Sequence, residues 1–222
     1  MTGRLSIHRY LDPGDALGEV LFGLIMALTF TVGARLIPEA EELDARELVV
    51  AALGCNIAWG VIDGVLFVLG ALYHRSRRAR FYRALKRAGS EAEAMAVVQE
   101  EFGLEDEPLA IDPADRARLH QAIHALAANA PSGKVRLHSR DFIAAIVVFF
   151  LVAASAVPGI VPFLLLDDAD LALRLSNAVL LLLLFLAGYG WAHYTDSTPW
   201  RVGLTVAVLG LVMVLVAIAL GG

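Results

Sequence analysis

The fold of this chain is decided by residues 142–166, which read FIAAIVVFFLVAASAVPGIVPFLLL and contain no charged side chain. A helix rises about 1.5 Å per residue, so this stretch is long enough to cross the roughly 30 Å hydrocarbon core of a bilayer. Inside lipid every backbone N–H and C=O group must be paired within the segment, which favours a helix. Residues 142–166 are therefore predicted to form a transmembrane helix.

Four other stretches are also long and mostly apolar, and the composition of the whole chain is that of a membrane protein. Hydrophobic residues make up 58% of the 222 positions and charged residues 18%, against roughly 45–50% and about 25% in soluble domains. The mean hydropathy is +0.67. We therefore predict an all-α polytopic membrane protein with five transmembrane helices, at Ala16 to Leu36, Leu48 to Tyr73, Phe142 to Leu166, Leu171 to His193 and Val202 to Leu220.

The charge and the cysteine content argue against two other classes of protein. The chain has 18 basic and 23 acidic residues, which gives a net charge of −5. Binding of nucleic acid needs a basic face in excess of the protein's own carboxylates, so no nucleic-acid partner is expected. The single cysteine, Cys55, excludes a framework of intrachain disulfides.

Basic residues close to the ends of the spans predict the orientation of the chain. A cluster of seven follows the second span directly and places that side in the cytoplasm, whereas residues 39–44 and 167–170 on the opposite side are rich in acids. We expect a multi-pass protein of the inner (plasma) membrane, with its N-terminus in the cytoplasm and its C-terminus outside. The cluster consists of Arg75, Arg77, Arg78, Arg80, Arg83, Lys86 and Arg87.

The only sizeable polar segment lies between the second and third spans and reads as three helices. The first continues the second span, Ser90 with Glu93 forms a capping box that opens the second, and Asp112 caps the third. The chain is therefore predicted to divide into three parts. These are residues 1–73 with the first two spans, a cytoplasmic helical insert at 74–140, and residues 141–222 with the last three spans.

Polar side chains inside the spans are candidates for a transport pathway, because an ionisable group in lipid is costly unless it faces protein or water. Glu19 and Met26 share one face of the first span, and Asn56 and Asp63 share one face of the second, with Cys55 beside them. Asp63 lies well inside the hydrocarbon, which indicates a functional or coupling role. The alternatives are an interfacial charge for Glu19 and helix packing for Asn56 and Cys55.

Two prolines, Pro158 and Pro162, interrupt the hydrogen bonding of the third span. They predict a helix break, which in a transporter can present backbone carbonyl groups to an ion. The alternative is a kink that serves packing alone.

The predicted insert offers side chains that suit a divalent cation. Glu93 and Glu100 share a face of its second helix, and Glu101 adjoins them. His120 and His124 on the third helix have the i, i+4 spacing that can present two nitrogens to one ion. If these helices face each other, they can bind iron, manganese or zinc. The alternative is that they are solvated surface helices with incidental histidines.

The order of two spans, a three-helix insert and three further spans resembles the vacuolar iron transporter family, including its bacterial members. The local sequence is similar in three places. These are Phe22-Gly23-Leu24 in the first span, ASAVPGIVPFLL at Ala154 to Leu165, and Trp200-Arg201-Val202-Gly203-Leu204 before the last helix.

The resemblance implies a homodimer that exports ferrous iron or manganese from the cytoplasm against protons. It implies ligands among the carboxylates and a methionine of the first two spans, and among glutamates and methionines of the insert. Phe22 stands where the family has its mid-membrane aspartate, so Glu19 is the expected substitute, while Glu47 and Cys55 match the glutamate and methionine of the second span. In the insert the matching residues are Glu93, Met95, Glu100 and Glu101.

Two functions follow from these patterns. The first is a secondary transporter that exports a divalent cation, iron or manganese, coupled to protons and without a permanently bound cofactor. The second is a non-transporting membrane scaffold or sensor whose insert binds a metal or a protein partner. Membrane lipid, the metal ion and a second copy of the chain are the expected partners. An enzyme is not expected, because no nucleophile with a base lies at a membrane face.

Overall fold

The computed structural model describes residues 10–36, 45–102, 112–128 and 134–220. These residues form helices joined by short connections, and no strand occurs among them. The all-α prediction is therefore confirmed for this part of the chain. The helices are α1 (Pro13–Leu36), α2 (Ala45–Arg87), α3 (Glu91–Glu101), α4 (Pro113–Ala128), α5 (Ser139–Ser155), α6 (Val157–Leu165), α7 (Ala169–Trp191), the 3₁₀ turn η3 (Ala192–Tyr194) and α8 (Pro199–Ala219).

Five helical segments of the described chain are long and apolar enough to cross a membrane, which confirms the predicted number of spans. The third of them combines α5 and α6. The second belongs to α2, which has 43 residues and is much longer than the roughly 20 residues that one crossing needs. The five segments are Pro13–Gly33, Arg46–Arg87, Ser139–Leu165, Ala169–Tyr194 and Pro199–Val216.

The chain divides into two compact units. The first, here called the membrane unit, consists of Met1–Val68 and Ser139–Gly222. The second, Leu69–His138, contains the end of α2 together with α3 and α4, and is here called the insert. The division at 74–140 made from the sequence stays a prediction, and α2 runs through its first boundary as one helix.

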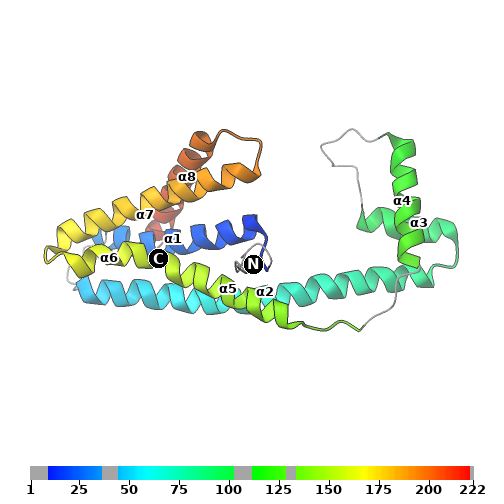
Figure 1. Ribbon diagram of the computed structural model, residues 1–222, viewed down its shortest axis with the longest axis horizontal. Helices are drawn as coiled ribbons and strands as arrows, with labels where there is room; N and C mark the ends of the chain where they lie inside the picture. The colour runs from blue at the N-terminus through cyan, green and yellow to red at the C-terminus, as the bar shows by residue number, and fades with distance from the viewer. Residues whose placement is uncertain (1–9, 37–44, 103–111, 129–133, 221–222) are drawn as a thin grey trace, which may run out of the picture. The chain divides into compact units, whose positions relative to one another are not determined.

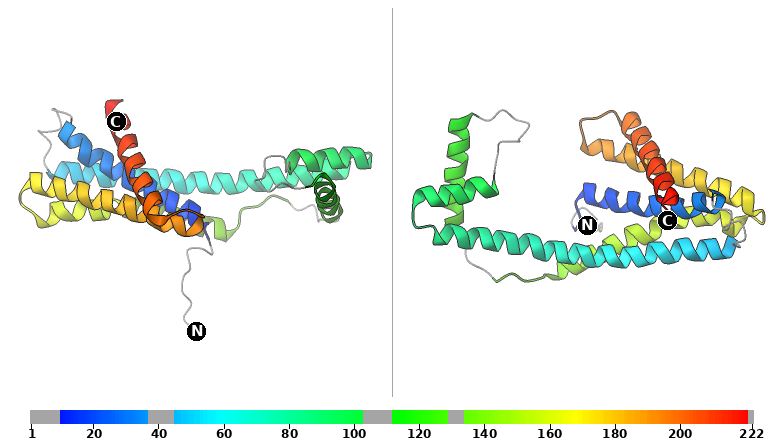
Figure 2. Two further views of the ribbon diagram at one scale, coloured as in Figure 1. Left: turned by 90° about the horizontal axis from the view of Figure 1, so that it is seen from above. Right: turned by 180° about the vertical axis from the view of Figure 1, so that it is seen from behind.

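Helix α1 lies at the centre of the membrane unit, where it contacts α5, α7 and α8 (Figures 1 and 2). The core between these helices contains Leu28, Leu180, Leu184 and Val214, all fully buried. Lipid tails are as apolar as leucine, so burial among helices contributes mainly through close van der Waals packing. The core therefore depends on the shapes of these side chains more than on their hydrophobicity.

Helices α7 and α8 form a hairpin in which two glycines allow the helices to pack closely. A Cβ atom on Gly188 would lie 2.7 Å from Cβ of Val206, and one on Gly203 would lie 2.8 Å from Cε2 of Phe185. Neither position has room for a side chain, so the two helices touch at their backbones. The Phe185 ring also packs edge-on against Trp200, with the ring centroids 4.9 Å apart.

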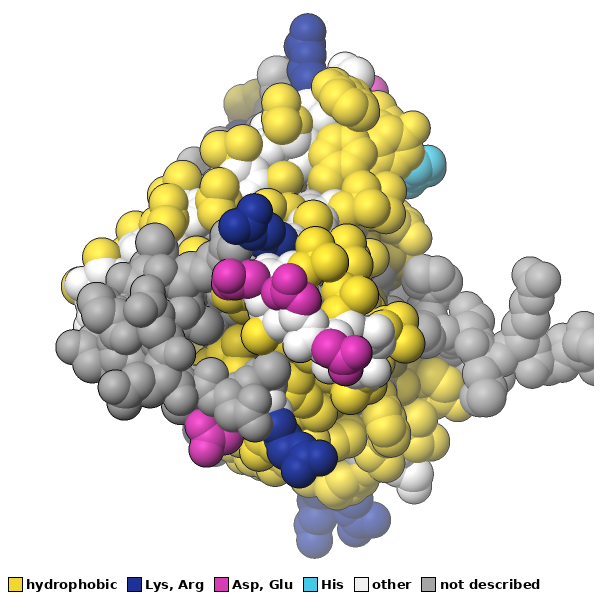
Figure 3. Space-filling model, turned by 90° about the vertical axis from the view of Figure 1, so that its left-hand side faces the viewer, with side chains coloured by type: hydrophobic (Ala, Val, Ile, Leu, Met, Phe, Trp, Pro, Cys, Tyr) yellow, Lys and Arg dark blue, Asp and Glu magenta, His cyan; other side chains and the backbone are white. Residues whose placement is uncertain are grey.

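The end of the membrane unit at which α6 turns into α7 is charged. Figure 3 shows Asp, Glu, Lys and Arg side chains among the hydrophobic ones at this end. Asp167, Asp168 and Asp170 are exposed here, and Asp168 Oδ1 accepts a hydrogen bond from Leu171 N at 3.1 Å. Carboxylates at the start of α7 also interact favourably with the helix dipole, which fixes where this helix begins.

The insert has its own small core and the helix caps that the sequence predicts. Phe81 and Leu85 of α2 pack with Val98 of α3. Ser90 Oγ accepts a hydrogen bond from Glu93 N at 3.2 Å, and Asp112 Oδ1 accepts one from Ala114 N at 2.7 Å. These caps satisfy free amide groups at the starts of α3 and α4, because the first turn of a helix has no partners of its own.

Candidate functional site

Asn56 on α2 joins three helices of the membrane unit at one point. Its side chain is fully buried, and Nδ2 donates hydrogen bonds to Gly23 O on α1 at 2.9 Å and to Val152 O on α5 at 3.0 Å. Ser155 Oγ lies 3.5 Å from the same nitrogen and donates to Val152 O at 2.7 Å. We call these four residues the Asn56 junction. Breaking it would leave buried polar groups unpaired, so it holds the three helices together.

Two glycines extend the contact between α2 and α5 over the next two turns. A Cβ atom on Gly60 would lie 2.9 Å from Phe149 O, and one on Gly64 would lie 3.0 Å from Ala145 O. Small residues at this spacing let two helix backbones approach closely in lipid. The polar face of the second span therefore packs on α5 as well as on α1.

Glu19 on α1 and Asp63 on α2 form a pair of acidic side chains inside the membrane unit. Both are half-buried, and the two carboxyl groups interact electrostatically. Asp63 Oδ2 is buried and has no hydrogen-bond partner in the described part of the chain. Two like charges repel strongly where the dielectric is low, so a proton or a cation would stabilise the pair. This is the arrangement in the membrane unit best suited to hold either one.

The other predicted pathway residues do not all gather at this pair. Met26 and Cys55 are half-buried, and Glu47 is exposed near the start of α2. From the rise of a helix, Glu47 lies about 24 Å along α2 from Asp63, too far for both to bind one ion. If Glu47 takes part in transport, it must therefore bind the ion at a different position along the pathway.

The third span has a one-residue interruption of its helical hydrogen bonding at Ala156, whose backbone angles stay helical at φ −72° and ψ −27°. Helix α5 ends at Ser155, α6 begins at Val157, and Gly159 N bonds to Ala156 O at 3.1 Å. Pro158 lies in the first turn of α6, where a missing N–H is tolerated, and Pro162 lies inside α6. The interruption therefore precedes both prolines and directly follows the Asn56 junction.

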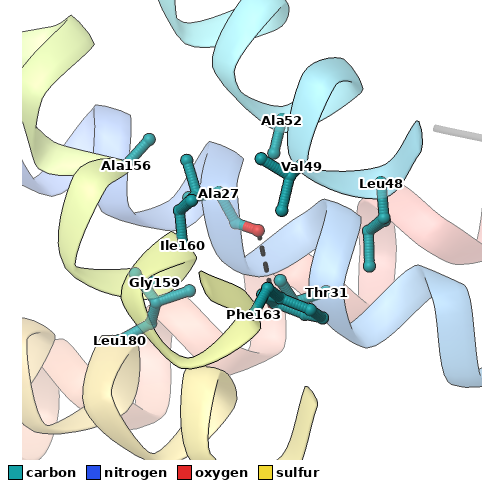
Figure 4. A pocket seen from close by; sticks show the side chains of 10 residues that line it. All are labelled: Ala27, Thr31, Leu48, Val49, Ala52, Ala156, Gly159, Ile160, Phe163 and Leu180. Atoms are coloured by element: carbon teal, nitrogen blue, oxygen red, sulfur yellow. Dashed lines mark hydrogen bonds between the residues drawn. The ribbon is translucent and has the colours of Figure 1, made fainter. Parts of the chain in front are cut away.

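A small cavity lies beside this interruption (Figure 4). Among the described residues that line it, the one polar side chain is Thr31, whose hydroxyl is 3.3 Å from Ala27 O and 3.2 Å from Leu28 O. A bound cation needs several oxygen or nitrogen ligands, so this cavity does not suit an ion. It is lined by Ala27, Thr31, Leu48, Val49, Ala52, Ala156, Gly159, Ile160, Phe163 and Leu180.

Two of the acidic residues predicted as metal ligands in the insert make structural contacts. Glu93 Oε2 accepts a hydrogen bond from Gly89 N at 2.8 Å, in the region of the α3 cap. Glu101 forms an ion pair with Arg77, with 3.1 Å between Oε1 and Nε. Glu100 is exposed and Met95 is half-buried.

The two histidines of α4 differ in their surroundings. His120 is buried, and its Nε2 lies 3.0 Å from Phe102 O, one of the carbonyl groups at the end of α3. His124 is half-buried. Among the described residues, no group of three or more His, Cys, Asp or Glu side chains is placed to hold a metal ion. Metal binding by the insert stays a prediction, and the acidic residues 105–107 lie outside the described residues.

Replacing His120 by alanine is expected to destabilise the insert by about 1–3 kcal/mol, because Phe102 O loses its partner and a cavity opens. The loss should be the same with and without Mn²⁺. Hydrogen exchange of insert amides in the full-length protein measures it, with His124→Ala as the matched control. If both variants lose a stabilisation that appears only with Mn²⁺, the two histidines act together as ligands and the structural role is wrong.

Sequence reasoning missed Ser155 and Val152, which complete the Asn56 junction. The available signal was a lone serine among alanines just before Pro158. A serine that bonds to a carbonyl three or four residues earlier often bends a helix, so it can mark an interruption. Nothing in the sequence alone indicates that this serine faces Asn56.

Five helices long and apolar enough to cross a membrane, with two half-buried carboxyl groups on the first two of them, are typical of membrane transport proteins. The family model described as the VIT family, that of vacuolar iron transporters, matches residues 71–222, which is more than half of the chain. The protein belongs to this family, whose members are membrane metal-ion transporters. The match begins after Glu19, Asn56 and Asp63. No curated protein matches the chain.

Proposed function

We propose that this protein is a secondary transporter that exports a divalent metal cation, iron or manganese, from the cytoplasm in exchange for protons. The observation that carries the proposal is the Glu19–Asp63 pair, in which a buried carboxylate oxygen has no partner in the described part of the chain. The ion is the transported substrate and not a resident cofactor. Family membership supports metal transport as the activity.

Exchange follows from the chemistry of two carboxyl groups whose charges repel each other. The pair is neutralised either by protons or by a divalent cation, and the two compete for the same oxygens. A site that must release one to accept the other couples their movements. Proton-coupled export is thus a property of Glu19 and Asp63 together and not of either residue alone.

The Asn56 junction supplies the barrier on one side of this pair. Its hydrogen bonds hold α1, α2 and α5 together at Gly23, one helical turn along α1 from Glu19. An ion therefore passes only when these helices separate. The interruption at Ala156 lies next to the junction and offers a hinge between α5 and α6. Transport then proceeds by opening this contact on alternate sides of the bound ion.

The orientation follows from the charges at the span ends. The basic cluster at the end of α2 supports a cytoplasmic insert, and the acidic residues at the turn between α6 and α7 support an outward-facing turn. The N-terminus is then cytoplasmic and the C-terminus outside the plasma membrane. In this arrangement the insert meets the ion first, with Glu100 and His124 as available ligands, and the transporter works as a homodimer.

Flux into inside-out membrane vesicles tests the proposal, because export from the cytoplasm appears there as uptake. Fe²⁺, Mn²⁺, Co²⁺ and Zn²⁺ are offered separately, with and without a pH gradient. We expect saturable uptake of iron or manganese that an acidic lumen accelerates. If correctly folded protein moves none of the four ions, transport is wrong and the insert becomes the binding module of a scaffold or sensor.

A further inference from the structure

Four arginines near the end of α2 carry charges that nothing in the described part of the chain neutralises. Arg78, Arg80, Arg83 and Arg87 are exposed and take part in no ion pair or hydrogen bond with the described residues. We call them the arginine surface. By contrast, Arg77 in the same stretch is paired with Glu101.

The arginine surface lies mostly on the face of α2 that turns away from the core of the insert. Arg80, Arg83 and Arg87 have the spacing i, i+3, i+7 and share one face, whereas Phe81 and Leu85 are buried against α3 and α4. None of the described residues covers this surface, so it is available to a ligand.

Interactions within helix α2 do not stabilise these positive charges. The helix dipole favours cations only in the last turn, which explains Arg87 but not Arg78, Arg80 or Arg83. Like charges one turn apart destabilise a helix slightly, so an unpaired series has a cost. An external anion would offset that cost.

The position of the surface along α2 indicates which kind of anion can reach it. The last large apolar side chains exposed on this helix are Leu72 and Tyr73. From the helix rise, Arg78 lies about 8 Å and Arg80 about 10 Å beyond Tyr73. The headgroup layer is about 5–7 Å thick, and a long arginine side chain can reach back into it. Arg83 is farther away but within about a Debye length of that layer.

We propose that the arginine surface binds the headgroups of anionic phospholipids. Clusters of four to eight basic residues directly after a transmembrane helix have this chemistry, and guanidinium groups bind phosphate through two hydrogen bonds. The lipid contributes the negative charge that the described part of the chain does not supply. This inference concerns the insert side of α2 and does not depend on metal transport.

Native mass spectrometry of the delipidated full-length protein tests the proposal. Phosphatidylglycerol and phosphatidylcholine are offered in equal amounts, and the bound lipids are counted. We expect a preference for phosphatidylglycerol that falls at least about tenfold in the triple variant Arg78→Gln, Arg80→Gln, Arg83→Gln, since each arginine near a membrane surface changes binding by about fivefold. The preference should also weaken as salt is raised.

A second triple variant, Arg118→Gln, Lys134→Gln, Arg136→Gln, removes the same charge from exposed positions of the insert. It should keep the preference for phosphatidylglycerol. Equal binding by the wild type and the first variant overturns the proposal, as does an equal loss in both variants. Complete displacement of the lipid by inorganic phosphate would show that the surface recognises free phosphate, which also overturns the choice of a lipid. Unchanged helix content in both variants excludes misfolding.

Discussion

Asp63→Asn is expected to lower metal flux at least a hundredfold while leaving the protein folded. The substitution keeps the size of the side chain but removes its charge. A single charge about 4 Å from a cation contributes about 4 kcal/mol at an effective dielectric constant of 20, which corresponds to roughly a thousandfold in binding. Initial uptake rates in proteoliposomes, compared at equal protein content, measure the effect.

Asp170→Asn is the matched control, because Asp170 is an exposed carboxylate of the membrane unit away from the pair. Its flux should equal that of the wild type. Glu19→Gln should resemble Asp63→Asn, and the double variant should be no worse than either, since two residues that act as one site are not additive. Wild-type flux in Asp63→Asn would refute the assignment of the pair.

Gly23→Ala is expected to destabilise the membrane unit by about 1–3 kcal/mol, the usual cost of inserting an extra carbon into a packed core. A Cβ atom at this position would overlap Ser155 Oγ and lie 2.7 Å from Val152 O, so α1 and α5 would have to move apart. The Asn56 hydrogen bond to Gly23 O would be lost with them. Thermal unfolding in detergent, followed by loss of monodisperse protein, measures the change.

Gly18→Ala provides the control on the same helix, because a Cβ placed there meets no atom of the other described elements within 4 Å. We expect unchanged or slightly higher stability, since alanine favours a helix more than glycine does. Equal stability of Gly23→Ala and the wild type would show that α1 and α5 are not in close contact at this point.

The spans and the helix caps were predictable because both depend on short stretches of sequence. An apolar run such as 142–166 determines a span by its length, and Ser90 or Asp112 caps a helix through its own neighbours. The faces of Glu19 and Asp63 could be predicted in the same way, from helical spacing. Their electrostatic interaction could not be predicted, because spacing says nothing about which helices are adjacent.

Contacts between distant residues account for what the sequence did not reveal. Asn56 bonds to Val152, which lies 96 positions later, and no local pattern indicates this pairing. His120 shows the same limit, since its spacing from His124 predicts a metal site but does not reveal that the side chain is buried beside Phe102 O. The interruption at Ala156 differs from the proline positions because a proline in the first turn stabilises the start of a new helix.

The glycine contacts between α7 and α8 have a consequence for the thickness of the surrounding bilayer. Helices of 23 and 21 residues are about 34 and 32 Å long, close to the hydrocarbon thickness of an ordinary membrane. Because Gly188 and Gly203 lock the two backbones together, the helices cannot slide past each other to shorten or lengthen the pair. In a thinner membrane the hairpin must therefore tilt as one body, or the bilayer must thicken locally around it. The length of the hairpin itself does not change.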